Sequence, residues 1–199
     1  GFERIGMLIF ARIAADLGTV GFAVHNICMN ICDIYYCFAV GFGKASMVLA
    51  GQSCGRGSVF DWLRYRRVGI RWTLLFSTIS FVLTVVFRKE IFSIYSDSPE
   101  TLALSGTVMV LAALVSYPEA HALVAAGILR GSGRTASVAA YSFVSVTILR
   151  PIMTAIFFYV LGLGIVGIWM ALLFDQCIRA SCAEFLVHRL DYMRAPAKA

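Results

Sequence analysis

Charged side chains are scarce in this sequence. Aspartate, glutamate, lysine and arginine make up 14% of its 199 residues, against about 25% in an ordinary soluble domain. Hydrophobic residues make up 60%, which is more than a soluble domain of this size can bury. The same composition excludes a disordered or collagen-like chain. The sequence therefore predicts an integral membrane protein.

The alternating pattern of membrane β-strands is also missing, and long unbroken apolar runs take its place. Since about 20 residues span the hydrocarbon core, the length predicts an all-α bundle of six transmembrane helices over residues 1–199. We expect a polar loop at 53–67, a polar loop at 88–100 that is partly an interfacial helix, and turns at 129–134 and 162–167. Pro118 and Pro151 are expected to kink their helices. The expected helices cover roughly residues 2–17, 22–50, 68–87, 101–127, 136–161 and 168–187.

Acidic residues are fewer than basic ones, 11 against 17, and the net charge is +6. The basic residues gather in short connections between apolar runs, which indicates membrane topology and no nucleic-acid partner. Only Arg88 and Lys89 fall on the opposite side. We therefore expect the 53–67 loop and both termini to be cytoplasmic, in the plasma membrane of a bacterium. The residues on that side are Arg56, Arg64, Arg66, Arg67, Arg71, Arg130, Arg134, Arg189, Arg194 and Lys198.

Motifs for catalysis or metal binding lack their usual surroundings. GQSCG (51–55) matches a nucleophile elbow, but no strand precedes it. GLGIVG (162–167) matches a dinucleotide motif, but it joins two apolar helices. The six cysteines lie mostly inside apolar runs and are expected to be small buried hydrophobic residues. We therefore predict no enzyme, no metal and no cofactor.

Several charges lie inside the expected spans, where each costs roughly 2.5–3.5 kcal/mol on insertion scales. Arg12 and Asp16 are four residues apart, and so are Asp175 and Arg179. This spacing places each pair on one helix face, so both pairs are expected to be structural ion pairs.

Other polar residues have no such local partner. Asn26, Asn30, Asp33 and Cys37 share one helix face, and Tyr36 is assigned with them to a cavity lining. This face predicts either a water-filled cavity or a polar contact between helices. Glu3 and Glu119 also lack an obvious partner. Together with Asp33 they are candidates to bind a proton or a sodium ion.

Six segments resemble the second half of the multidrug and toxic compound extrusion (MATE) transporters, in the family's order and over nearly the whole chain. AAGILRGSGRT (125–135) is the most specific of them. The resemblance implies a protein of two six-helix bundles around a central cavity, of which this chain, beginning at Gly1 without a methionine, is the C-terminal bundle. The other segments are LGTVGFAVHNICMNI (17–31), LAGQSCGRG (49–57), IFSIYSDSPE (91–100), ILRPI (148–152) and GLGIVGIWMALLFD (162–175).

The resemblance also implies a function: export of small amphiphilic organic cations in exchange for protons or sodium ions, with the missing N-terminal half and the lipid bilayer as partners. Glu3 and Glu119 match family positions associated with ion coupling, and Asn30 matches a polar position. Arg130 belongs to the LRG turn (129–131) and is expected to be a structural residue. Arg134 departs from the family, because many members carry aspartate there.

Three other interpretations stay open at this point. A lipid-linked sugar flippase of related fold would need a strongly basic cavity, which the membrane-embedded acids disfavour. An intramembrane enzyme would need a histidine or serine constellation at one depth. A membrane scaffold would transport nothing.

Overall fold

The computed structural model describes the backbone of residues 2–95 and 99–194, and the side chains of residue 6, residues 8–95 and residues 106–190. Its regular elements are all helical, with no strand in the described ranges, so the predicted all-α fold is confirmed. The elements are α1 (Phe2–Ala15), α2 (Gly18–Gly55), α3 (Val59–Val86), α4 (Arg88–Tyr95), α5 (Pro99–Gly131), α6 (Thr135–Phe143), η1 (Val144–Leu149), α7 (Arg150–Ala155), η2 (Ile156–Val160) and α8 (Gly164–Arg194).

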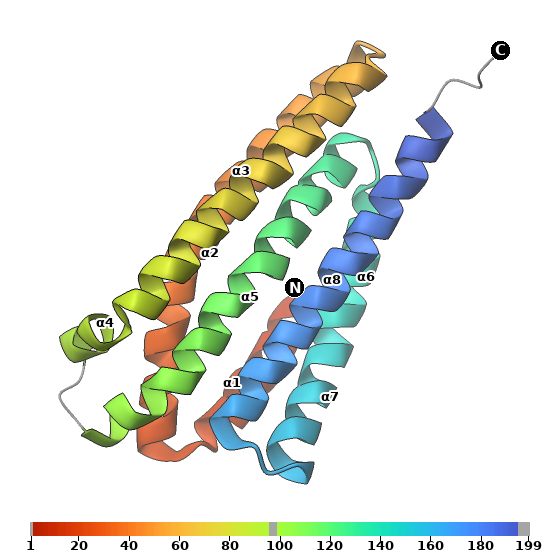
Figure 1. Ribbon diagram of the computed structural model, residues 1–199. Coiled ribbons are helices and arrows are strands. Elements are labelled where there is room, and N and C mark those ends of the chain that lie inside the picture. Colours follow the sequence, from red (N-terminus) through yellow and green to blue (C-terminus); the bar gives the residue numbers. More distant parts are fainter. Residues whose placement is uncertain (1, 96–98, 195–199) are drawn as a thin grey trace.

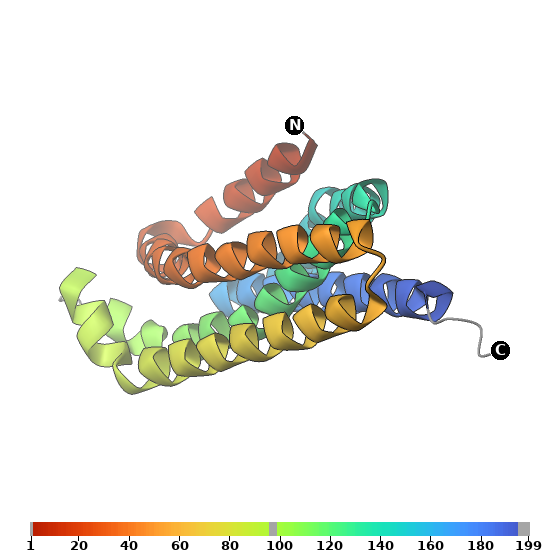
Figure 2. The same ribbon diagram turned by 90° about the horizontal axis from the view of Figure 1, so that it is seen from above.

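Helix α5 runs through the middle of the bundle and packs against α2, α3 and α8 (Figures 1 and 2). Elements α6 to η2 form one continuous rod, and α1 packs mainly against η1 and α7. Within the described residues, five stretches are long and apolar enough to cross a membrane. Helix α1, with 14 residues, is shorter than these five stretches and completes the six helices of the predicted bundle.

The helices are longer than the sequence pattern suggested, and the connections are shorter. The expected loop at 53–67 is wrong, because α2 continues to Gly55 and α3 begins at Val59. Gly57 makes the turn with φ +68°, a conformation that glycine adopts without a steric penalty. Ser58 then caps α3 by accepting a hydrogen bond from the backbone N–H of Asp61 at 3.3 Å. The expected turns at 129–134 and 162–167 likewise begin or end inside helices.

The two prolines inside expected helices act differently. Pro118 lies within α5, which continues past it to Gly131. Pro151 stands in the first turn of α7, directly after the π-helical segment η1. Proline has no N–H to donate to the preceding turn, and a wider turn relieves the resulting strain.

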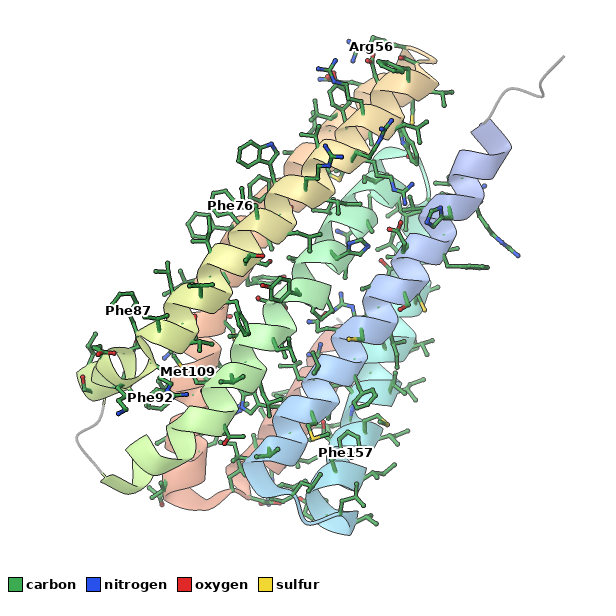
Figure 3. All side chains as sticks on the ribbon, viewed as in Figure 1. Arg56, Phe76, Phe87, Phe92, Met109 and Phe157 are labelled. Carbon is green, nitrogen blue, oxygen red and sulfur yellow. The ribbon has the colours of Figure 1, made fainter. Side chains whose placement is uncertain are left out.

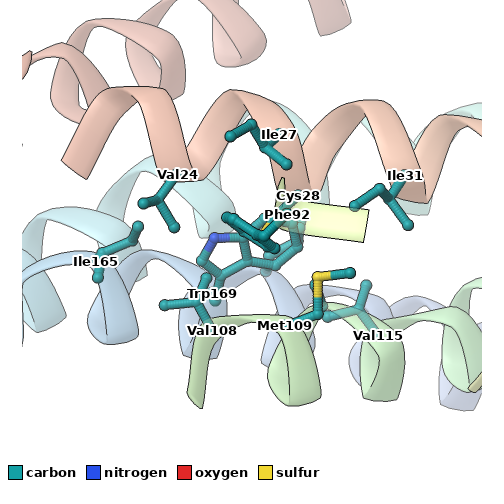
Figure 4. Close-up of a cluster of buried hydrophobic side chains, with 12 residues drawn as sticks. Val24, Ile27, Cys28, Ile31, Phe92, Val108, Met109, Val115, Ile165 and Trp169 are labelled. Atoms are coloured by element: carbon teal, nitrogen blue, oxygen red, sulfur yellow. The ribbon is translucent and has the colours of Figure 1, made fainter. Parts of the chain in front are cut away.

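The bundle has two main apolar clusters, one toward each end. In the cluster drawn in Figure 4, Trp169 of α8 and Phe92 of α4 lie between α2 and α5 and are fully buried. The second cluster is built around Trp62 and Leu129. Between α2 and α5, glycines bring the two backbones into contact: Gly127 lies against the carbonyl of Gly43, as in close-packed membrane helices.

Apolar side chains also cover the outside of the bundle. Trp72, Phe76, Val86 and Phe87 of the α3 segment are all more than a third exposed, and Figure 3 shows Phe76 and Phe87 pointing outward. Exposed apolar faces of this extent need a lipid environment. The structure therefore describes an integral membrane protein.

Candidate functional site

The polar face of α2 lies on the surface of the bundle. Asn26, Asn30, Asp33, Tyr36 and Cys37 are all exposed, with Tyr36 at 42%. The neighbouring face of the same helix carries the buried core residues. The stripe is therefore open to a water-filled space or to another protein surface, and both expected alternatives remain.

Glu119 lies within the bundle, on α5. Its Oε1 accepts a hydrogen bond from Nε2 of Gln176 on α8 at 2.9 Å. Glu119 also borders a small cavity of about 10 Å³, together with Tyr35 and Ser116, which is room for about one water molecule. The carboxylate is thus held by a neutral amide and has a small cavity beside it that hydroxyl-bearing side chains help to line.

The nearby charge pair joins different helices from the pair expected from the sequence. Arg150 of α7 donates from Nε to Oδ2 of Asp175 on α8 at 2.8 Å, and Asp175 is fully buried. Ser145 of η1 also donates to Asp175. The expected pair of Asp175 with Arg179 is wrong in the part of the chain that the structure describes. The two residues share a helix face, but the Asp175 carboxylate turns toward the neighbouring rod, where a guanidinium and a hydroxyl both reach it.

These contacts show that the buried Arg150 pairs with the carboxylate of Asp175. Arg150 is bound to Asp175, and its guanidinium also lies over the Phe10 ring at 6.0 Å from the centroid. Among the described side chains, no ion pair reaches Glu119. A polar layer therefore crosses the bundle from Glu119 through Gln176 and Asp175 to Arg150. Arg150 and Arg179 lie near enough to act on the Glu119 charge, but in the described residues neither forms an ion pair with it.

The Arg12–Asp16 pair lies at the turn between α1 and α2, where Arg12 Nη1 donates to Asp16 Oδ1 at 2.6 Å. Tyr159 donates to the other carboxylate oxygen at 2.5 Å. The Tyr159 hydrogen bond, followed by the Arg12 contact, lowers the pKa of Asp16 below its usual value. Both members of the pair are exposed, so it joins the α1–α2 turn to η2 at the surface.

The remaining predicted residues are placed as follows. The side chain of Glu3 lies outside the described residues, so its proximity to Glu119 stays a prediction. Arg130 is exposed in the last turn of α5. The Nε atom of Arg179 is buried and has no hydrogen-bond partner, and Arg134 is exposed just before α6.

Sequence analysis missed a second polar cluster, centred on Glu184 of α8. Its carboxylate binds Arg66 of α3, accepts from His121 Nε2 on α5 at 3.0 Å and lies 3.1 Å from His188 Nε2. The four-residue spacing of Glu184 and His188 was the available signal. The links to α3 and α5 were not visible, because they depend on helix packing. Within the described residues, no three histidine, cysteine or acidic side chains could hold a metal ion.

Comparisons with known proteins agree with this architecture. The family model described as MatE matches residues 2–156. The crystal structure of MATE in the bent conformation superposes with a TM-score of 0.88 at 12% sequence identity, over 97% of this chain and 43% of that chain. An outward-facing multidrug resistance MATE transporter of the MOP superfamily gives 0.88 at 13% identity, over 97% of this chain and 44% of that one. The inward-facing form gives 0.88 at 13%, over 100% and 46%. The chain thus spans less than half the length of these structures.

Proposed function

The chain belongs to the MatE family, and from this we propose that it forms one six-helix bundle of a transporter that works by alternating access with a second bundle. It is similar in fold to both an outward-facing and an inward-facing transporter. The exposed polar stripe on α2, with Asn30 and Asp33, supports a facing partner, because such residues are unfavourable against lipid. The partner in this proposal is the N-terminal six-helix bundle.

Coupling rests on Glu119 in this proposal, with Asp33 and Glu3 as further carboxylates that bind the driving proton or sodium ion. A membrane-embedded carboxylate without a cationic partner attracts a small cation or a proton. A small amphiphilic organic cation competes for the same charge, so that one leaves when the other binds. Export then follows from exchange of the two across the membrane.

One observation carries this assignment: Glu119 is bound by the neutral amide of Gln176, while Arg150 is bound by Asp175. If Arg150 neutralised Glu119, the carboxylate would serve as one half of a structural ion pair and would have little affinity for another cation. The arrangement leaves Glu119 without an ion-pair contact among the described side chains, beside a small cavity that hydroxyl-bearing residues help to line.

The alternatives receive less support. Ser53 of the GQSCG motif lies inside α2 and donates to the Leu49 carbonyl at 2.8 Å, so it is not a nucleophile on a strand-to-helix turn. MatE proteins are transporters and not enzymes, which agrees with that geometry. A flippase for a pyrophosphate-linked sugar would need a basic surface, whereas the α2 stripe carries Asp33 and two amides. A scaffold would need no unpaired carboxylate in the membrane.

The orientation belongs to the same proposal. The α2–α3 turn, the α5–α6 turn and the C-terminal end of α8 lie at one end of the bundle (Figure 1). Together with the first three turns of α3, these segments carry most of the arginines. The positive-inside rule places that end in the cytoplasm. We place the protein in a bacterial plasma membrane with this end of the bundle, including the C-terminal end of α8, inside.

The test is efflux of an organic cation dye, such as ethidium, from cells that express the complete transporter. Glu119→Gln is expected to reduce efflux at least tenfold while its abundance in the membrane stays near that of wild type. Glu90→Gln, which removes an exposed acid on α4, is the matched control and should retain efflux. Wild-type efflux by Glu119→Gln would reject Glu119 as the coupling residue.

A further inference from the structure

A cavity of about 280 Å³ lies between the end of α5, the start of α6 and the last turns of α8. The cavity is separate from the Glu119–Gln176 contact, because its lining residues on α5 and α8 lie further toward the α5–α6 turn. Its volume is much larger than the roughly 10–15 Å³ that one water molecule needs. One part of its lining is apolar and the other is polar and cationic. The lining residues are Leu129, Leu186 and Leu190 in the apolar part, and Arg134, Ser137 and Arg189 in the polar part.

Two arginines from different parts of the chain line this cavity. Arg134 precedes α6 and Arg189 belongs to α8, where its guanidinium lies over the Phe185 ring at 5.0 Å from the centroid. Among the side chains that the structure describes, neither arginine forms an ion pair with a carboxylate. Two like charges that converge repel each other unless an anion lies between them. Guanidinium groups match the oxygens of a phosphate with paired hydrogen bonds.

The start of α6 adds further donors to the same place. Its N-cap residue is Arg134, which makes no side-chain capping hydrogen bond. The backbone N–H groups of a first helical turn carry partial positive charge and suit an anion. Ser137, in that turn, contributes a hydroxyl to the cavity lining. The two guanidiniums, the hydroxyl and the helix end therefore favour the same kind of ligand.

The cavity lies where the membrane-spanning stretches end. The stretch in α5 ends at Gly131 and the next begins at Thr135, and the cavity lies beside both ends. These positions correspond to the headgroup layer of a bilayer. Basic pockets between helices at this level bind anionic lipid headgroups.

We propose that this cavity binds the phosphate group of an anionic phospholipid. Arg134 and Arg189 hold the phosphate oxygens, and Leu186 with its leucine neighbours contacts the hydrocarbon that follows the headgroup. The apolar part of the lining distinguishes this ligand from a free phosphate ion, which has no hydrocarbon to cover.

The experiment measures the melting temperature of the complete, membrane-extracted transporter in neutral detergent as phosphatidylglycerol or phosphatidylcholine is added. Phosphatidylglycerol is expected to raise the melting temperature of the wild type by several degrees more than phosphatidylcholine does. The double variant Arg134→Gln/Arg189→Gln should lose this difference. Arg56→Gln/Arg64→Gln, which removes two exposed charges from the same end of the bundle outside the cavity, should keep it.

Two further arms make the result decisive. Inorganic phosphate at millimolar concentration should give no shift, and the same shift with inorganic phosphate as with phosphatidylglycerol would overturn the lipid assignment. Native mass spectrometry of the wild type needs no variant, and it should show phosphatidylglycerol retained under conditions that remove phosphatidylcholine. An equal phosphatidylglycerol shift in the wild type and in Arg134→Gln/Arg189→Gln, or equal retention of both lipids, would overturn the site itself.

Discussion

Arg150 and Asp175 form a buried ion pair that joins α7 to α8, with Arg150 Nε 2.8 Å from Asp175 Oδ2. The pair is separated by 25 residues along the chain, and its carboxylate is completely buried. Gln176, the next residue along α8, binds Glu119 on the other side. One turn of α8 thus carries Asp175, which pairs with Arg150 of α7, and Gln176, which binds Glu119 of α5.

Asp175→Asn is expected to destabilise the bundle strongly, because it leaves the Arg150 guanidinium buried without its counter-charge. Loss of one partner of a buried ion pair typically costs about 3–5 kcal/mol. We expect a lower melting temperature and a marked loss of protein from the membrane, measured by thermal unfolding and by quantitative immunoblotting.

The exposed pair supplies the control for that prediction. Asp16→Asn removes one partner of the Arg12–Asp16 pair, which lies at the surface, where solvent screens the charges and such a pair contributes little to stability. Its abundance should stay near that of the wild type. Equal stability of Asp175→Asn and Asp16→Asn would show that the buried pair does not hold α7 to α8.

Gly127→Ala should loosen the contact between α2 and α5. A Cβ atom at Gly127 would collide with the backbone carbonyl of Gly43, which cannot move aside as a side-chain tip can. Overpacking of this kind typically costs about 1–3 kcal/mol. Gly41→Ala is the matched control, since its Cβ would enter open space on α2, the helix that also carries Gly43. A melting temperature that falls as much in Gly41→Ala as in Gly127→Ala would contradict the close packing.

The all-α membrane fold could be predicted because composition and apolar run length determine it. The helix ends could not, because charge marks where the hydrocarbon ends and not where the helix ends. Arg64 and Arg67 suggested a loop, yet they lie on α3, which continues beyond its apolar stretch with its own cap at Ser58. A helix that extends into the headgroup layer can carry arginines at no cost in backbone hydrogen bonds.

Individual candidate residues of the site could be picked out from the sequence, but their arrangement could not. Glu119 and Asp175 stood out as acids inside apolar runs. Helical spacing proposed Arg179 as the partner of Asp175, whereas the actual partner, Arg150, comes from another rod. The rotation of neighbouring helices decides such pairs, and it depends on tertiary contacts such as that of Gly127 with Gly43. The amide of Gln176 gave no signal because a single glutamine is common on any helix.

Tyr159→Phe should raise the pKa of Asp16 toward its ordinary value. The Tyr159 hydroxyl is the largest cause of the lowered pKa, ahead of Arg12. A carboxyl with a lowered pKa in the folded state stabilises it above the unfolded-state pKa, and that stabilisation is lost as pH falls through the folded-state pKa. NMR titration of the Asp16 carboxyl carbon should therefore give a higher midpoint in Tyr159→Phe. Tyr36→Phe, on the exposed stripe of α2, should leave the midpoint unchanged.

The proposed orientation predicts which positions an impermeant thiol reagent reaches in intact cells. In a background without the six native cysteines, Ser93→Cys on α4 should be labelled from outside. Ser58→Cys, at the turn between α2 and α3, should be labelled only after the membrane is opened. Labelling of Ser58→Cys from outside intact cells would reverse the topology.

The central claim is that Glu119 binds the ion that drives export, and it is tested most directly by gradient-driven exchange in proteoliposomes containing the complete transporter. An imposed proton or sodium gradient should drive accumulation of an organic cation by the wild type. Glu119→Asp, which keeps the carboxylate, should retain part of this activity, and Glu119→Gln should show no gradient-driven accumulation while its melting temperature stays near that of the wild type. Accumulation by Glu119→Gln at the wild-type rate under both gradients would contradict the account.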